Sequence, residues 1–339
     1  MNILAVANNF NFIGNENPRV PFSRQSYLTR HIVLLNSEEN QSMKRFLLIM
    51  VFLAVTLSKC LADDLDASLF VAVEKGDSTA ATNLLAKGAR VDARNDRGWT
   101  PLIVAVREDY SEIVSNLVEK GADVNARSTS TNGSAVLCFA AEAGDLKVIQ
   151  FLLDHGADID IQSKDGRTPL YDAATKKQLA AARLLLAKGA DPNKLVRKIE
   201  KGNVLTPLMG ATVLNDVEMV DLLLQNGGHL EKRCNDGSTT LMLAAKIAGP
   251  EMIKLLIAKG ANVNATGPKG HTALIFAAYN GQLETVKLLL AAGANPSAKA
   301  TDGDDPDKKN YDAAYLAEQQ GHPEIQQLII EAQKRAISP

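Results

Sequence analysis

Residues 270–293, GHTALIFAAYNGQLETVKLLLAAG, contain two short runs in which apolar residues recur at helical spacing. Leu274, Ala277 and Ala278 occupy positions i, i+3 and i+4, and the same spacing recurs after Gly281. Isolated helices shorter than roughly 12–15 residues are marginal in water. We therefore predict two paired helices that need neighbouring segments to cover their apolar sides.

The rest of the chain repeats this segment. A Gly-Ala pair, once Gly-Gly, follows the second apolar run of each copy, with spacings of 33, 35, 33, 38, 33 and 33 residues. A second marker, Thr-Pro-Leu or a degenerate form of it, opens the first run. Thr caps free helix N–H groups and Pro fits the first helical position, whereas Gly ends a helix in the left-handed conformation. The full second marker begins at Thr100, Thr168 and Thr206.

A 33-residue period with paired helices, Thr-Pro-Leu and tails such as GADVNA at 121–126 resembles the ankyrin repeat. The resemblance covers roughly residues 64–335. It implies an all-α fold, an ankyrin-repeat solenoid of about eight helix–turn–helix units with projecting β-hairpin loops. Residues 65–93 lack a preceding hairpin and residues 312–335 end in a polar helix, so we expect them to cap a repeat domain at 63–339.

The front of the chain differs from the repeats. Residues 1–42 show no periodicity, and we interpret them as an unstructured extension or an over-extended gene start. From Met43 the chain has a basic start, an apolar run at 46–57 and small residues, Cys60 and Ala62, at positions −3 and −1 of a cut after Ala62. This is the layout of a secretory signal peptide cleaved after that alanine. Residues 43–62 therefore predict a periplasmic or secreted protein.

Two other interpretations of the apolar run stay open. It could remain uncleaved and anchor the protein in a membrane, although its 12 residues are fewer than the roughly 20 that a span needs. It could also be an apolar tail without a targeting role.

Composition and motifs argue against catalysis. With 22% charged and 46% hydrophobic residues and a net charge of −2, neither disorder nor nucleic-acid binding is indicated. We find no phosphate-binding glycine loop, His-Glu-x-x-His or Cys-x-x-Cys, and we expect no enzyme activity, cofactor or metal site. An EF-hand starting at Asp302 would need oxygen ligands at Pro306 and Ala313 and has neither. A loop-based enzyme or metal-binding protein is the least favoured alternative.

The resemblance implies a binding surface built from two positions of each repeat, namely the residue before the capping Thr and the residues late in the first helix. A tryptophan beside arginines is typical of an interface hot spot, although Trp99 could instead only cover the edge of the second unit. The predicted partner-binding residues are Trp99, Arg107, Arg167, Lys176, Leu205, Val213, Leu214, His271 and Tyr279.

Basic residues on the hairpins suggest the kind of partner. Arg94, Arg97, Arg127 and Arg167 form a row, and the hairpin at 194–205 is also basic. This favours a protein partner with an acidic surface, unless the charges only solvate the hairpins. We expect a monomeric, non-catalytic protein-interaction scaffold that binds through hairpin tips and the concave helix side.

The resemblance extends to exported bacterial ankyrin-repeat proteins, which are periplasmic or secreted. We expect no nucleic-acid partner, and membrane contact only through residues 46–57 if they are not cleaved. The alternative is an effector or adaptor delivered to a host cell.

Overall fold

The computed structural model describes residues 38–130, 132–196, 205–301 and 310–337. By its internal contacts the chain divides into two units, Met1–Leu61 and Ala62–Pro339. The described part contains sixteen α-helices, α2 to α17, and the 3-10 helix η2 (Pro268–Gly270), with no strand. Most of the predicted extension, the basic residues of the 194–205 hairpin and the acidic segment 302–307 lie outside the described residues.

Helix α2 (Glu38–Glu74) contains the predicted signal segment. Within the described residues, α2 is the one helix that is long and apolar enough to cross a membrane. The candidate span, Arg45–Glu74, is longer than the 12-residue apolar run seen in the sequence. A signal sequence satisfies the same criterion. Residues 38–42 are helical rather than unstructured, because Glu and Gln in this stretch favour a helix that the apolar run continues.

From residue 62 onward the helices form eight pairs, beginning with the end of α2 and α3 (Ser78–Ala86). Most of the later helices have seven to nine residues. The other first helices are α4 (Pro101–Arg107), α6 (Val136–Ala143), α8 (Pro169–Thr175), α10 (Pro207–Val213), α12 (Thr240–Ile247), α14 (Ala273–Tyr279) and α16 (Ala313–Gln319). Their second helices are α5 (Ser111–Glu119), α7 (Leu146–Asp154), α9 (Leu179–Ala187), α11 (Val217–Gln225), α13 (Pro250–Ala258), α15 (Leu283–Ala291) and α17 (Pro323–Ile337).

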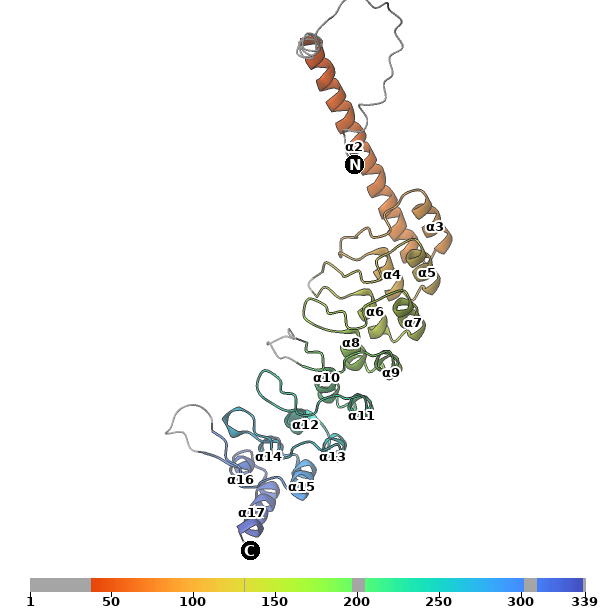
Figure 1. The fold of residues 1–339 in the computed structure, drawn as a ribbon. Helices are drawn as coiled ribbons and strands as arrows, with labels where there is room; N and C mark the ends of the chain where they lie inside the picture. Colours follow the sequence, from red (N-terminus) through yellow and green to blue (C-terminus); the bar gives the residue numbers. More distant parts are fainter. Residues whose placement is uncertain (1–37, 131, 197–204, 302–309, 338–339) are drawn as a thin grey trace, which may run out of the picture. The chain divides into compact units, whose positions relative to one another are not determined.

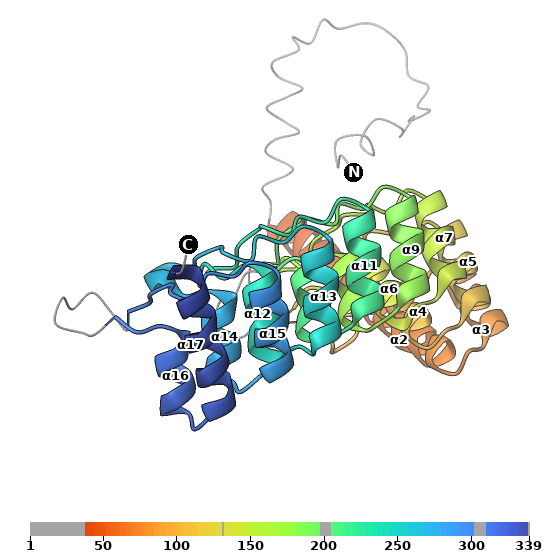
Figure 2. The same cartoon turned by 90° about the horizontal axis from the view of Figure 1, so that it is seen from below.

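Successive first helices pack on one another and so do successive second helices, which gives two rows (Figures 1 and 2). Helices this short depend on such neighbours for their stability. The leucine of each Thr-Pro-Leu marker or its degenerate form lies at the centre of a layer and is at most 2% exposed, at Leu102, Leu137, Leu170, Leu208, Leu241 and Leu274. The predicted solenoid of about eight units is confirmed.

The helix ends follow the sequence markers. The hydroxyls of Thr100, Thr168 and Thr206 accept backbone N–H groups three residues further along at 3.2–3.3 Å, and proline follows each of them. The glycines after the second helices have positive φ, for example 88° at Gly156 and 90° at Gly260. The helix-capping residues predicted from the sequence are therefore present.

Side chains in the tails tie each repeat to the next. Asn193 donates from Nδ2 to the Gly227 carbonyl at 2.9 Å, and its Oδ1 accepts the His229 N–H at 2.8 Å. Asn125 and Asn264 bind the following repeat in the same way. These bonds satisfy backbone groups at the ends of the second helices, and they hold the layers at a constant offset.

The loops between one pair and the next, which we call fingers, project on the side of the first helices (Figure 1). The described parts of the fingers contain no strand, and the antiparallel pairing expected of the predicted β-hairpins is limited there to isolated bridges. Three of the longer fingers contain an isolated antiparallel bridge between described residues. The other described fingers close through one backbone bond between residues four apart, as in Asn95–Trp99. The shorter fingers have too few residues for a ladder. The bridges are Arg127–Ala135, Val196–Leu205 and Ala300–Tyr311.

Candidate interaction surface

The last turns of the first helices form one side of the repeat unit, which we call the first-helix face. Val213 and Leu214 at the end of α10, Ile247 at the end of α12 and Tyr279 at the end of α14 are 38–53% exposed. They occupy equivalent positions in three consecutive repeats, and we call them the apolar stripe. Three of the four belong to the predicted binding residues.

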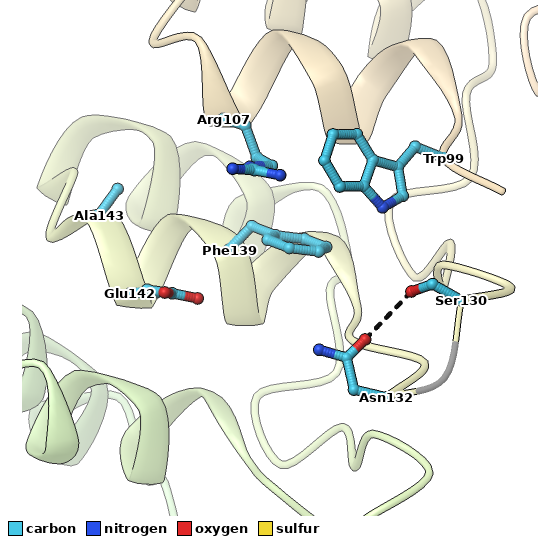
Figure 3. A pocket seen from close by; sticks show the side chains of 7 residues that line it. All are labelled: Trp99, Arg107, Ser130, Asn132, Phe139, Glu142 and Ala143. Atoms are coloured by element: carbon cyan, nitrogen blue, oxygen red, sulfur yellow. Dashed lines mark hydrogen bonds between the residues drawn. The ribbon is translucent and has the colours of Figure 1, made fainter. Parts of the chain in front are cut away.

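Trp99 and Arg107 meet at the other end of the same face, where Phe139 joins them (Figure 3). The Arg107 guanidinium carbon lies 4.3 Å from the Trp99 ring centroid and 5.8 Å from that of Phe139. The two rings pack edge to face at 6.2 Å. Arg97 lies over the same indole at 5.1 Å. The sequence predicts the Trp99–arginine contact but not the second ring.

A cavity of about 350 Å³ opens beside this cluster. Ser130 and Asn132 of the finger and Glu142 of α6 complete its lining (Figure 3). Glu142 is paired with Lys176 of the next repeat at 2.8 Å. The acid at this cavity is therefore neutralised by another predicted surface residue.

A second aromatic cluster lies between α12 and α16. His271 stacks on Phe276 at 5.3 Å, and its Nε2 lies 3.0 Å from the Tyr311 hydroxyl. Lys246 Nζ is 4.2 Å from the Phe276 ring centroid. A cavity of about 480 Å³ opens here, and its lining includes Tyr279. His271 thus orders this cluster through both its ring and its nitrogen.

The structure assigns Arg167 an internal role that differs from its predicted role in partner binding. Its Nη1 lies 3.4 Å from Asp172 Oδ1 and its Nη2 donates to Ser134 Oγ at 3.2 Å, while Nε lies 3.2 Å from Asp165 without hydrogen-bond alignment. Asp172 is 2% exposed. Burial raises the pKa of Asp172 to about 7, because desolvation outweighs the attraction of Arg167.

The arginines of the predicted basic row make contacts between neighbouring fingers. Arg94 donates to the Arg127 carbonyl at 2.7 Å, and Arg127 in turn donates to the carbonyl of Gln162. Arg233 donates to the Thr266 carbonyl at 2.9 Å. These guanidinium groups donate to backbone carbonyls of the next finger, so they help to hold neighbouring fingers together. Arg97 is the member of the row that reaches the Trp99 cluster.

Leu205, another predicted binding residue, is half-buried, and its backbone forms the bridge with Val196.

Four residues of the first-helix face are missing from the binding residues predicted from the sequence. Phe139 and Phe276 lie four residues after the residue that caps the first helix, where other repeats carry Val, Asp, Gly or Leu. An aromatic residue at a position that is otherwise not aromatic is the sequence signal that could have identified them. Tyr311 precedes its cap as Trp99 does, and Ile247 follows Lys246 at the position of Leu214.

The described residues hold no group of three or more His, Cys, Asp or Glu side chains arranged for a metal ion. Cys138 and Cys234 are both buried and unpaired with each other. What the described face presents is therefore aromatic rings, apolar side chains and cations, which are the components of protein interfaces.

Comparison with known proteins agrees with the repeat architecture. The family model for ankyrin repeats (3 copies) matches residues 46–128, 125–196, 208–300 and 241–337. The solved ankyrin repeat domain of Bcl-3, described as a unique member of the IkappaB protein family, superposes with a TM-score of 0.57 at 27% identity. That match covers 66% of this chain and 97% of the Bcl-3 domain.

Curated relatives match over shorter segments. A protein of Fowlpox virus named for its ankyrin repeats is 38% identical over 86 residues, which is 25% of this chain and 14% of the viral protein. The Homo sapiens ankyrin repeat and KH domain-containing protein 1 is 36% identical over 109 residues, or 32% of this chain and 4% of that protein. An ankyrin repeat protein of Rickettsia felis is 36% identical over 117 residues, or 31% and 45%. This chain spans less than half the length of each.

Proposed function

This chain belongs to the ankyrin-repeat family, and on that premise we propose that it is a non-catalytic scaffold that binds another protein through the first-helix face. The apolar stripe is the observation that carries the proposal. Of the large apolar side chains exposed in residues 62–339 of the described part, most lie on the first helices or at their ends, whereas Leu146 alone lies on a second helix. Exposed apolar groups gathered on one side mark an interaction site.

The aromatic clusters support the same side of the molecule. Trp99 and Phe139 lie on the same face, separated from the stripe by the α8 repeat, and Phe276 with Tyr311 lies at the far end of the stripe. Aromatic residues and arginine are enriched among residues that dominate binding energy. A partner lying along the first helices would therefore meet anchoring groups at both ends and apolar contacts between them.

Site-specific photocrosslinking tests this proposal. We expect p-benzoylphenylalanine at Ile247 or at Tyr279 to crosslink the same protein in the native host, because both side chains are exposed on the stripe. The matched control is the same probe at Leu146, which is 41% exposed on α7. The readout is mass spectrometry of the crosslinked bands. Equal capture from Leu146, or different proteins from the two stripe positions, would contradict the proposal.

We also propose that residues 43–62 are an export signal, so that the repeat unit works in the periplasm or outside the cell. The basic start, the apolar run and the helix α2 support this. N-terminal sequencing of the exported protein is expected to begin at Asp63. Recovery of the chain with Met1 or Met43 intact would reject cleavage, and its recovery in the membrane fraction would favour an anchor. A compartment-resolved tag assay separates both outcomes from delivery into a host cell.

A further inference from the structure

Arg107 is a cation of the first-helix face that is oriented but not neutralised. Its guanidinium lies over Trp99 and beside Phe139, and it makes no ion pair or hydrogen bond with any described residue. Two lysines of the face are paired, Lys176 with Glu142 at 2.8 Å and Lys246 with Asp236 at 3.5 Å. Stacking on the rings fixes the plane of the guanidinium and leaves its N–H edge available.

The cavity beside Arg107 carries further unused donors. Ser130 donates to Asn132 Oδ1 at 3.2 Å, which leaves the Asn132 amide nitrogen without a partner among the described residues (Figure 3). The Trp99 indole N–H likewise makes no hydrogen bond with a described residue. Three donors from the finger, the finger junction and α4 therefore line one cavity. Glu142, the carboxylate that also lines this cavity, forms an ion pair with Lys176 instead of with these donors.

A donor-rich cavity with an unpaired guanidinium suits an anion. The planar guanidinium fork matches a carboxylate in a bidentate geometry. Arg97 over the same indole adds a second positive charge, and the adjoining cavity is lined by Arg97 together with the acid Asp96. The volume of about 350 Å³ is that of a side-chain pocket.

We propose that this cavity, lined by Trp99, Arg107, Asn132 and Phe139, binds the carboxylate of an Asp or Glu side chain on the protein partner. The inference rests on the proposed scaffold function and adds the chemistry of one contact. The acidic group binds at Arg107 while neighbouring residues of the same partner segment cover the apolar stripe. The finger row at Arg94 and Arg127 takes no part, because its guanidinium groups bind backbone carbonyls.

Selection from a random 15-residue peptide library displayed on phage tests the proposal with a defined probe. The purified protein is expected to enrich peptides that combine Asp or Glu with apolar residues. Arg107→Gln is expected to lose the acidic preference and keep the apolar one. An acidic preference that survives Arg107→Gln, or apolar peptides without acids from the wild type, would overturn the carboxylate site and leave the scaffold function standing. Failure to enrich any peptide would reject both.

Affinity measurements on one selected peptide sharpen the result. Arg107→Gln is expected to weaken binding at least about tenfold, and Arg107→Lys less, because lysine keeps the charge but not the fork. The matched control is Arg183→Gln on α9, an exposed arginine of the second-helix row, with a change below about twofold. Replacing the acidic residue of the peptide by its amide should cost the same factor in the wild type and nothing further in Arg107→Gln. Additive losses would overturn the contact.

Discussion

Asp172→Asn is expected to stabilise the repeat unit by up to about 4 kcal/mol at pH 8 and by only about 1.5 kcal/mol at pH 5. Asp172 is buried in the first helix of the fourth repeat, and burial raises the pKa of its carboxyl from 3.8 to about 7. Asparagine is similar in size and remains neutral, so it reproduces the protonated side chain at every pH.

The sign follows from proton linkage. Between pH 3.8 and about 7 the folded chain keeps a proton on Asp172 that the unfolded chain has lost, so the free energy of unfolding falls as the pH rises through this window. Above pH 7 both states are ionised and the loss is complete. The Arg167 guanidinium beside the carboxyl reduces this cost but does not remove it, because desolvation of the charge is the larger effect.

Urea unfolding at pH 5 and pH 8 measures the difference between the two proteins. Trp99 is the only tryptophan, and it lies two repeats from Asp172, so its fluorescence reports the affected half while circular dichroism reports all helices. Asp154→Asn is the control, because that side chain is exposed on α7. A pH dependence as large in Asp172→Asn as in the wild type would refute the assignment.

Val213→Gln combined with Ile247→Gln is expected to weaken binding of the crosslinked partner by about 100-fold. Both side chains lie in the apolar stripe at the ends of α10 and α12. Truncating an apolar contact at the centre of an interface costs binding energy, and an amide placed there must also lose its water. Both positions are exposed in the free protein, so the melting temperature should shift little.

The control for the stripe is Leu146→Gln, which makes the same kind of change at an exposed position of a second helix. It is expected to bind like the wild type. Isothermal titration with the purified partner gives the affinities, and thermal unfolding by circular dichroism shows that each variant is folded. Equal losses from Leu146→Gln and from the stripe variant would remove the stripe from the interface.

The sequence by itself determined the repeat architecture. Helix pairs, the caps at Thr100, Thr168 and Thr206 and the terminating glycines could be predicted because each signal lies within one repeat. Apolar spacing, capping hydroxyls and positive φ act over three or four residues, and a period repeated seven times reinforces each of them.

Tertiary packing determines which arginine guanidinium groups bind other groups of the chain and which have no hydrogen-bond partner among the described residues. Arg94, Arg127 and Arg167 resemble Arg97 and Arg107 in the sequence, but the first two bind the next finger and Arg167 binds buried Asp172. The contacts from Arg94 to Arg127, from Arg127 to Gln162 and from Arg167 to Ser134 join residues about one repeat apart, and they depend on the offset between stacked layers. Local periodicity carries no information about that offset, so the division between structural and available arginines emerges only when the repeats are packed.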